Sequence, residues 1–236
     1  MTTILLTGAS RGIGAAACSL LRQRGAKIIG QSTQGDGDSV LAADFNQAGA
    51  ARGLWDRALE RTGGTIDVLV NNAGVFLANP LSRDDAAWST GWAETMQINL
   101  AAAAELSRLA VLHWLERGTG GRIVHVASRA GHRGDSPDHW HYAASKGGML
   151  AMHKSIARAY AGKGILSFAI TPGFVDTAMA GDYLASRGGE GILHDIPLGR
   201  VALPEEVAQI VAFCALDAPP SMTGTTIDAN GASYVR

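Results

Sequence analysis

The sequence contains little cysteine, little charge of either sign and no long apolar run. Only 17% of its residues are charged and the formal net charge is -1, which gives no electrostatic reason to expect nucleic acid or an anionic membrane as a partner. The two cysteines, Cys18 and Cys214, have no metal-binding or redox spacing, so we expect small buried side chains. No apolar segment is long enough to span a membrane, and a strand pattern beginning at Thr3 leaves no room for a signal peptide. These absences predict a cytoplasmic protein.

Glycine and apolar residues, by contrast, are abundant, with 30 glycines and 47% hydrophobic residues in 236 positions. The predicted strands are the short apolar runs Thr3–Leu6, Lys27–Gly30, Val40–Ala42, Val68–Val70, Arg122–Val126, Leu166–Ile170 and Thr226–Asp228. The predicted helices are the amphipathic segments Ile13–Arg24, Gly49–Arg61, Trp92–Arg117, Tyr142–Ala161 and Pro204–Leu216. No linker, charge block or repeat divides the chain. The alternation therefore predicts an α/β fold with one domain over residues 1–236, built on a doubly wound, mostly parallel seven-stranded sheet with helices on both faces.

A glycine-rich turn follows the first predicted strand, in the run Thr7-Gly8-Ala9-Ser10-Arg11-Gly12-Ile13-Gly14. Glycine lets the backbone adopt positive φ and approach a ligand closely. The helix that follows would present free N–H groups and a partial positive charge at its N-terminus. The Gly-x-x-x-Gly-x-Gly spacing differs from the commoner dinucleotide-binding fingerprint. The turn predicts a pyrophosphate site, and the alternative is a tight strand-to-helix turn that binds nothing.

A tyrosine and a lysine lie four residues apart at the start of one predicted helix. Tyr142 and Lys146 would share a helix face, one turn from each other. A free phenol loses its proton only near pH ~10, and a nearby lysine charge would lower that pKa toward neutrality. The pair is therefore a candidate proton donor or acceptor for the interconversion of a carbonyl and an alcohol. The alternative is a chance pair on a solvated helix face.

Four short segments stand in a characteristic order along the chain. They are TGASRGIG at Thr7–Gly14, NNAG at Asn71–Gly74, Ser128 with YAASK at Tyr142–Lys146, and PGFVDT at Pro172–Thr177. In this order and at these separations they resemble the short-chain dehydrogenase/reductase family in its classical form. The match extends to the closing segment Gly224–Asp228, and overall it is most similar to the 3-oxoacyl-[acyl-carrier-protein] reductase-like members. The resemblance implies a single NAD(P)-binding Rossmann domain.

The resemblance also implies roles for four catalytic residues. Tyr142 would be the general acid in reduction and the base in oxidation, and Lys146 would lower its pKa and bind the nicotinamide ribose. Ser128 would donate a hydrogen bond to the substrate oxygen, where negative charge develops. Asn99 would hold a water that connects Lys146 to solvent. The alternative for Asn99 is a solvent-facing residue or one that caps a kink, but its apolar neighbours favour a buried, bonded side chain.

A larger set of residues is implied to bind the cofactor. The Asn72 segment would pack against the adenosine half, Asp44 would contact the adenine edge, and the Val175 backbone with Thr177 would hold the nicotinamide carboxamide. The full implied set is Gly8, Ser10, Arg11, Gly12, Ile13, Gly14, Ser32, Thr33, Asp44, Phe45, Asn72, Ala73, Gly74, Tyr142, Lys146, Pro172, Gly173, Val175 and Thr177. The alternative for Pro172-Gly173 is a simple turn after a strand.

The end of the second predicted strand bears on the choice of cofactor. An acidic residue there would bond the ribose hydroxyls, and a basic one would accept a 2′-phosphate. The run Gln31-Ser32-Thr33 offers neither, although Ser32, Thr33 and Arg11 could all bind a 2′-phosphate. Asp36 and Asp38 follow and could repel it. We therefore expect NADP(H), with NAD(H) as the alternative.

Three histidines, His132, His139 and His141, precede or adjoin Tyr142. A His-x-His pair can bind metal, but no third ligand accompanies it at a recognisable spacing, so we expect no metal site. The sequence instead predicts a loop over Gly131–His141 beside the substrate, with Trp140 as an apolar wall. Ala178–Arg200, which contains Met179, Tyr183, Leu184, Ile192 and Leu193, would be either a mobile lid or a surface loop that touches no substrate.

These features favour an NAD(P)(H)-dependent oxidoreductase that acts on a ketone or a 3-oxoacyl group. One alternative is a secondary-alcohol, sugar or steroid dehydrogenase that works oxidatively. Another is a nucleotide-sensing protein on the same fold, against which the complete set Asn99, Ser128, Tyr142 and Lys146 argues. The expected partners are a small carbonyl or alcohol substrate, an acyl carrier protein or coenzyme A thioester, and further copies of the chain in a homotetramer or dimer. No nucleic acid or membrane partner is expected.

Overall fold

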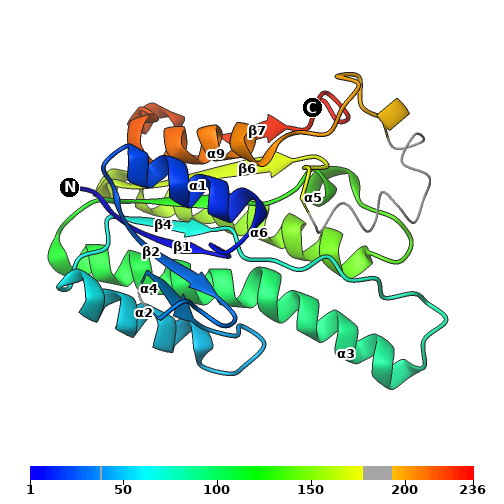
Figure 1. Ribbon diagram of the computed structural model, residues 1–236, viewed down its shortest axis with the longest axis horizontal. Helices are drawn as coiled ribbons and strands as arrows, with labels where there is room; N and C mark the ends of the chain where they lie inside the picture. The colour runs from blue at the N-terminus through cyan, green and yellow to red at the C-terminus, as the bar shows by residue number, and fades with distance from the viewer. Residues whose placement is uncertain (38, 178–192) are drawn as a thin grey trace.

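Seven parallel strands form one sheet at the centre of the molecule (Figure 1). The structure is a computed structural model that describes residues 1–37, 39–177 and 193–236. The strands are β1 (Thr3–Thr7), β2 (Lys27–Ser32), β3 (Val40–Ala42), β4 (Val68–Asn71), β5 (Gly121–Val126), β6 (Ile165–Pro172) and β7 (Thr226–Ala229). Their order is β3-β2-β1-β4-β5-β6-β7, and each neighbouring pair is parallel. The predicted doubly wound parallel sheet is therefore confirmed.

The helices cover both faces of this sheet (Figure 1). On one face lie α1 (Gly12–Gln23) and α9 (Pro204–Ala212), packed side by side. On the other face lie α2 (Ala50–Thr62), α4 (Ala102–Arg117) and α6 (Trp140–Tyr160). α3 (Asp85–Met96) extends beyond the sheet, and α5 (Ala130–Arg133) is one short turn after β5. Shorter helical turns are Gln97–Ala101, Ala161–Lys163, Phe213–Asp217 and Pro220–Met222.

Two apolar cores separate the sheet from its helical layers. Leu6 and Phe168 belong to the core under α1 and α9, whereas Leu5 and Trp114 belong to the core on the opposite face. Successive residues of a strand point to opposite faces, so a central parallel strand must be apolar on both. β1 is accordingly buried at every position. This is why the short apolar runs of the sequence predict strands correctly.

The strand order reverses at β1 and β4. β2 and β3 lie on one side of β1, whereas β4 to β7 lie on the other. In open sheets of this kind, a crevice forms outside the carboxyl ends of the strands at the point of reversal. The segments that follow β1, β4, β5 and β6 begin near Gly8, Asn72, Ala127 and Gly173, and all four residues line one cavity there.

The helix boundary that differs most from the prediction is the start of the segment Trp92–Arg117. The apolar pattern predicts a single helix over Trp92–Arg117, but α3 begins earlier, at Asp85. Asp84 caps it, because its Oδ1 accepts a hydrogen bond from the Ala87 N–H at 2.9 Å, and apolar periodicity does not reveal a cap of this kind. The π-helical turn Gln97–Ala101 then joins α3 to α4. π turns are frequent at functional sites, and this one contains Asn99.

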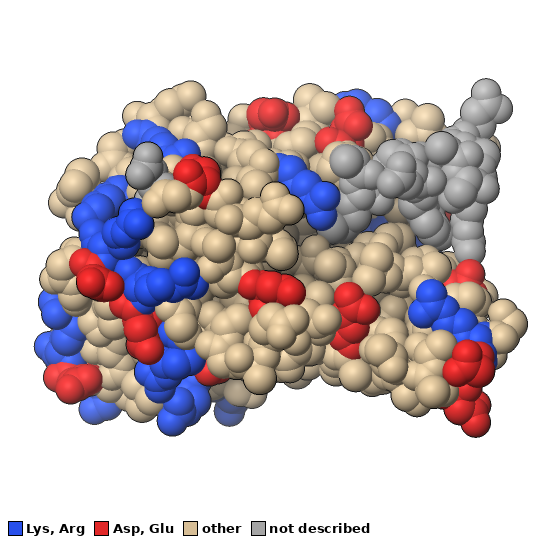
Figure 2. Space-filling model, turned by 60° about the horizontal axis from the view of Figure 1, so that its bottom comes forward, with Lys and Arg blue, Asp and Glu red and all other residues tan. Residues whose placement is uncertain are grey.

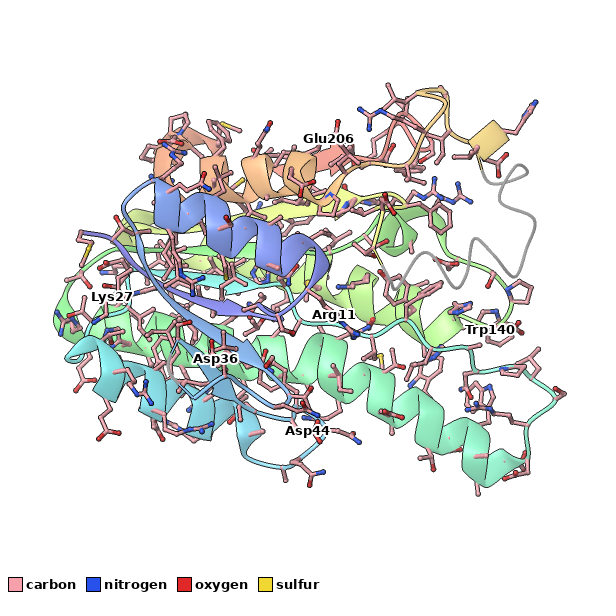
Figure 3. All side chains as sticks on the ribbon, viewed as in Figure 1. Arg11, Lys27, Asp36, Asp44, Trp140 and Glu206 are labelled. Carbon is pink, nitrogen blue, oxygen red and sulfur yellow. The ribbon has the colours of Figure 1, made fainter. Side chains whose placement is uncertain are left out.

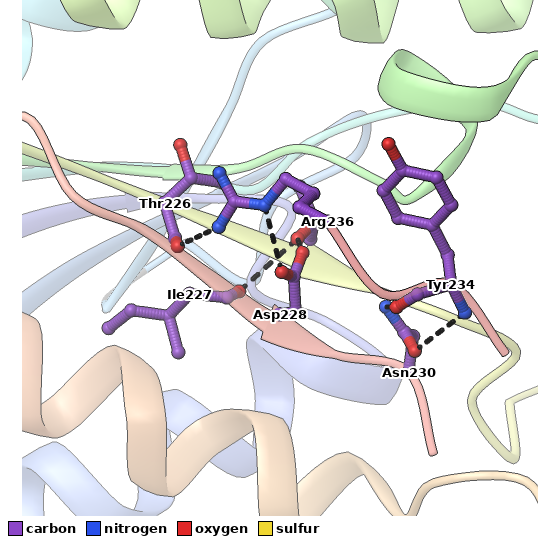
Figure 4. A network of polar contacts seen from close by, with 7 residues as sticks. Thr226, Ile227, Asp228, Asn230, Tyr234 and Arg236 are labelled. Atoms are coloured by element: carbon purple, nitrogen blue, oxygen red, sulfur yellow. Dashed lines mark hydrogen bonds and ion pairs between the residues drawn. The ribbon is translucent and has the colours of Figure 1, made fainter. Parts of the chain in front are cut away.

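The segment after β7 folds back onto that strand (Figure 4). Arg236 donates one hydrogen bond to the Thr226 carbonyl oxygen at 2.6 Å and another to the Asp228 carboxylate at 3.0 Å. Asp228 also accepts a hydrogen bond from the Thr171 hydroxyl at 2.5 Å. Thr171 precedes Pro172 at the end of β6, so this network fixes one wall of the crevice.

None of the helices in the described part of the chain is both long and apolar enough to cross a bilayer. Most of the lid predicted over Ala178–Arg200 lies outside the described residues, namely 178–192. Of the five residues named above for the lid, Met179, Tyr183, Leu184, Ile192 and Leu193, only Leu193 is described, and it is exposed.

Candidate active site

A cavity of about 910 Å3 opens at the carboxyl ends of the strands. We call it the central cavity. Its lining includes every residue of the implied cofactor-binding set, together with Ser128. Of the predicted catalytic and cofactor-binding residues, only Asn99 does not line it. The volume lies in the range typical of pockets that enclose a cofactor or small ligand.

The glycine-rich turn shapes one end of the central cavity. Gly8 and Gly12 have φ values of +69° and +52°, a region that side-chain-bearing residues rarely adopt. A Cβ at Gly12 would lie 2.9 Å from the Thr177 side chain, and a Cβ at Gly14 would collide with the Gly8 carbonyl oxygen. α1 starts at Gly12 without a side-chain cap, so the N–H groups of its first turn remain for a ligand. This backbone cradle fits a pyrophosphate.

The segment after β4 holds the glycine-rich turn in place. The Thr7 hydroxyl accepts hydrogen bonds from the N–H groups of Asn72 and Ala73, each at 3.0 Å. The Asn72 side chain donates to the carbonyl oxygens of Thr7 and Gly8 at 3.0 and 3.1 Å. These bonds join the ends of two neighbouring strands, which explains why an asparagine follows β4 beside a glycine-rich turn.

The predicted catalytic side chains meet farther along the cavity. Tyr142 and Lys146 lie on the first two turns of α6, and the Ser128 hydroxyl, just after β5, hydrogen-bonds the phenol. The Lys146 ammonium donates a hydrogen bond to the Val126 carbonyl oxygen at 2.9 Å and lies 5.8 Å from the centre of the Tyr142 ring. Three groups able to donate a proton or a hydrogen bond therefore converge on one end of the central cavity.

The pKa of Tyr142 differs from the expectation. Burial raises it to about 12, and the hydrogen bond from Ser128 offsets only part of this effect. Burial likewise lowers the pKa of Lys146 to about 8. Burial is the largest effect on the pKa of Tyr142, and the Asp135 charge raises it further. The phenol is thus a protonated donor at neutral pH in this structure.

Asn99 is completely buried in the π turn. Its Oδ1 accepts a hydrogen bond from the Val75 N–H at 2.8 Å, and its Nδ2 donates to the Val75 carbonyl oxygen at 3.0 Å and to the Ser145 hydroxyl at 3.2 Å. The predicted buried and bonded side chain is confirmed. Asn99 therefore fixes the loop after Gly74 against α6, one residue before Lys146.

Among the cavity-lining residues that the sequence did not predict, Gln31 and Phe76 make the most informative contacts. Gln31 accepts a hydrogen bond from the Gly8 N–H at 2.9 Å and donates to the Ala43 carbonyl oxygen at 2.7 Å, so it ties the glycine-rich turn to the segment after β3. Phe76 lines the cavity and meets the Tyr142 ring edge-on, with 4.7 Å between ring centres. The position of Phe76, two residues after the NNAG segment, was the available signal.

The prediction for Trp140 is wrong. This side chain is 51% exposed and does not line the central cavity, and it lies at the outer side of the molecule, far from Arg11 (Figure 3). As the first residue of α6, Trp140 points away from the face that bears Tyr142. In the described part of the chain no three metal-ligating side chains gather into a candidate metal site.

The residues predicted to select the cofactor, Ser32, Thr33 and Arg11, line the central cavity, as does Gln34. Asp36 does not line the central cavity, and Figure 3 shows its position relative to Arg11 and Asp44. The Asp36 carboxylate accepts hydrogen bonds from the Val40 N–H at 2.8 Å and from the Ser39 hydroxyl at 3.1 Å, which orders the turn between β2 and β3. Asp38 lies outside the described residues.

Comparison with known proteins agrees with this geometry. The family model described as Enoyl-(Acyl carrier protein) reductase matches residues 8–231. The chain is 36% identical to the 3-oxoacyl-[acyl-carrier-protein] reductases FabG of Vibrio cholerae and of Escherichia coli, over 98% of this chain and 96% of each relative. It is 34% identical to that of Pseudomonas aeruginosa, with the same coverage. The chain belongs to the short-chain dehydrogenase/reductase family and is an NAD(P)(H)-dependent oxidoreductase that interconverts carbonyl and alcohol groups.

Proposed function

We propose that this enzyme reduces the 3-oxo group of an acyl thioester to a hydroxyl with NADPH. The observation that carries this proposal is the convergence of the Tyr142 phenol, the Ser128 hydroxyl and the Lys146 ammonium in the cavity that also contains the glycine-rich turn. The names of relatives that match nearly the whole chain supply the substrate class. At neutral pH the phenol of Tyr142 carries the proton that reduction of a carbonyl group consumes.

The proposed roles follow from the positions of the side chains. The cofactor, when bound, supplies the hydride that reaches the carbonyl carbon. Tyr142 donates its proton to the carbonyl oxygen, and Ser128 donates a hydrogen bond to the same oxygen as negative charge develops there. Lys146 is positioned to bind the ribose and to favour the phenolate after proton transfer. Asn99 acts indirectly, by fixing the Val75 backbone and Ser145 beside Lys146.

The preference for NADPH rests on the end of β2. Gln31, Ser32 and Thr33 offer no carboxylate to the ribose, and the Asp36 carboxylate is bonded within the turn before β3. Arg11 lines the same cavity and can pair with a 2′-phosphate. The glycine-rich turn and the first turn of α1 would hold the pyrophosphate.

We also propose an acyl carrier protein or coenzyme A thioester as substrate carrier and a homotetramer, with a dimer as the alternative. On the face shown in Figure 2, charged side chains are densest at the left end, a second group lies at the lower right, and only scattered charged side chains lie between them, which suits contact between copies. All seven strands belong to one sheet, which supports one domain over residues 1–236. The free thiols of Cys18 and Cys214 suit a reducing compartment such as the cytoplasm.

Reduction of an enoyl thioester is the second candidate, because the matching family model is described by that activity. The two reactions differ in the atom that receives the proton. In 3-oxoacyl reduction the phenol must reach an oxygen, and the Ser128 hydroxyl lies beside the phenol, where it can donate to the same oxygen. This arrangement favours the oxygen of a carbonyl group.

Nicotinamide absorbance tests the proposal directly. NADPH and NADH would be supplied with 3-oxoacyl and enoyl thioesters of coenzyme A and acyl carrier protein, and with simple ketones. We expect turnover of 3-oxoacyl thioesters with NADPH, lowered about a thousandfold by Tyr142→Phe, while the NADPH dissociation constant stays nearly unchanged. Turnover of enoyl thioesters alone, or full activity of Tyr142→Phe, would refute the proposal. A monomeric mass in solution scattering would refute the tetramer.

A further inference from the structure

Phe76 contacts both the tyrosine of the active site and a buried histidine. Its ring meets the Tyr142 ring edge-on, with 4.7 Å between centres and an interplanar angle of 80°. It also stacks on the His139 ring, with 3.9 Å between centres and an angle of 10°. Phe76 and Tyr142 line the central cavity, whereas His139 does not and is only 3% exposed. Phe76 thus forms the wall beside the phenol, and His139 supports it from outside the cavity.

His139 is itself held from two directions. Its Nδ1 lies 2.7 Å from the Ser136 hydroxyl, within hydrogen-bond distance, and its backbone caps the N-terminus of α6. The Asn79 N–H donates a hydrogen bond to the Asp138 carbonyl oxygen at 2.8 Å, which joins the loop after β4 to the loop before α6. The two loops that contribute Phe76 and His139 are therefore bonded to each other as well as stacked.

The stack continues outward to α3. The rings of His139 and His141 lie nearly parallel with 6.3 Å between centres, and His141 lies 6.3 Å from Trp92. Trp92 in turn stacks on Trp88 at 5.4 Å. Because these rings come from α3 and α6, the wall formed by Phe76 is anchored to two helices. A wall of this kind resists displacement by a substrate.

We propose that Phe76 is a specificity-determining residue that limits the width of the group next to the reacting carbonyl, and that His139 is the positioning residue that keeps Phe76 in place. The inference rests on the proposed role of Tyr142 as general acid. The carbonyl oxygen must come within hydrogen-bond reach of the phenol, which brings the carbon next to the carbonyl against the Phe76 ring. A fixed aromatic wall there accepts an unbranched CH2 group and excludes a branched one. The substrate class is therefore a linear 3-oxoacyl chain.

Paired substrates test this inference. The ratio of kcat/KM for 2-methyl-3-oxobutanoyl-CoA to that for 3-oxobutanoyl-CoA would be measured with NADPH. We expect Phe76→Ala to raise the ratio about tenfold, since one methyl group changes discrimination by about that factor in a tight pocket. His139→Ala should raise it about threefold through the loss of stacking, whereas His139→Phe, which keeps a flat ring, should remain close to the wild type.

Two further measurements distinguish a change in substrate selectivity from a loss of folding. The NADPH dissociation constant and thermal unfolding identify variants that fail to fold. If Phe76→Ala fails to fold, Phe76→Leu is measured in its place. Trp140→Ala, an exposed neighbour outside the cavity, should leave the ratio unchanged. An unchanged ratio in a folded Phe76 variant would overturn the inference. If the wild type reduces no thioester, the proposed function fails. The ratio of kcat/KM for 3-methyl-2-butanone to that for 2-butanone then still decides the role of Phe76.

Discussion

The Lys146 ammonium and the Val126 carbonyl oxygen are joined by a hydrogen bond of 2.9 Å, which ties the second turn of α6 to the end of β5. Val126 lies two residues before Ser128, so the same bond fixes the strand end that presents the serine hydroxyl. Burial lowers the pKa of Lys146 to about 8, which allows both protonation states near neutral pH. Lys146 is therefore suited both to hold a ligand and to exchange a proton.

Replacement of Lys146 by alanine should impair catalysis more than it impairs folding. The Val126 carbonyl loses its donor and the phenol loses the adjacent positive charge. We expect kcat/KM to fall about a hundredfold and the NADPH dissociation constant to rise. Stopped-flow turnover and fluorescence titration would measure the two effects. Lys154→Ala, which removes an exposed lysine from the same helix, is the matched control, and an equal loss of activity there would contradict the assignment.

A carboxylate introduced at the end of β2 should reverse the cofactor preference. Thr33 is exposed and lines the cavity, and the Asp36 carboxylate is bonded to the Val40 N–H and the Ser39 hydroxyl. We expect Thr33→Asp to weaken NADPH binding relative to NADH by about tenfold, through repulsion of the 2′-phosphate. Thr33→Asn has nearly the same shape without the charge and should change the ratio little. Equal ratios for the two variants would show that charge at this position does not select the cofactor.

Two helical glycines offer a paired test of the cradle. A Cβ at Gly14 in α1 would collide with the Gly8 carbonyl oxygen, whereas a Cβ at Gly53 in α2 would meet no atom within 4 Å. We expect Gly14→Ala to lower the free energy of unfolding by about 2 kcal/mol and to weaken NADPH binding. Gly53→Ala should raise the free energy of unfolding by about 0.5–1 kcal/mol, since alanine is the better helix former. Urea denaturation of both variants measures the difference. If Gly14→Ala is as stable as the wild type, the backbone at Gly8 can move away from α1 at little cost.

Much of the fold and most of the site could be predicted because the relevant signals are local. The apolar run of β1 identifies a central strand, since a parallel strand is buried on both faces. The glycine-rich turn and the Tyr142–Lys146 pair are also short patterns. The turn needs residues that let the backbone approach a ligand closely, and the pair needs a phenol and an ammonium on one helix face. Tyr142, Lys146 and most residues of the turn line the central cavity.

The features that were missed depend on contacts between distant segments. The stack of Phe76 on His139 joins the loop after β4 to the start of α6, and no local pattern records it. Trp140 was assigned to the cavity, although its place on α6 directs it to solvent. The pKa of Tyr142 was expected to fall because a lysine is near in sequence. Burial raises it instead, and burial depends on the whole fold.

A buried pair of histidines predicts how stability depends on pH. His125 on β5 and His153 on α6 are both completely buried, with 6.0 Å between ring centres. The Asn71 side chain and the Ser167 hydroxyl lie within 3.4 and 2.8 Å of their Nδ1 atoms. Burial lowers the pKa of His125 to about 3, with His153 and Lys146 adding repulsion, and that of His153 to about 4. Both imidazoles are therefore neutral in the folded protein at any moderately acidic pH.

The unfolded chain binds protons at these histidines first, because their ordinary pKa is about 6.5. As the pH falls from about 6.5 toward about 4, the unfolded state gains protons that the folded state does not, so the free energy of unfolding decreases. Between about pH 7 and about pH 5 the loss should be about 2 kcal/mol for each histidine. Urea denaturation at several pH values would measure it in the wild type, in His125→Gln and in His153→Gln. Each substitution should flatten the slope, even if it lowers stability at neutral pH, whereas His194→Gln at an exposed site should not. Glutamine cannot take up a proton in this range, so each substitution removes one imidazole from the difference in bound protons between the unfolded and folded states. An unchanged slope in both buried variants would therefore mean that other groups cause the acid sensitivity.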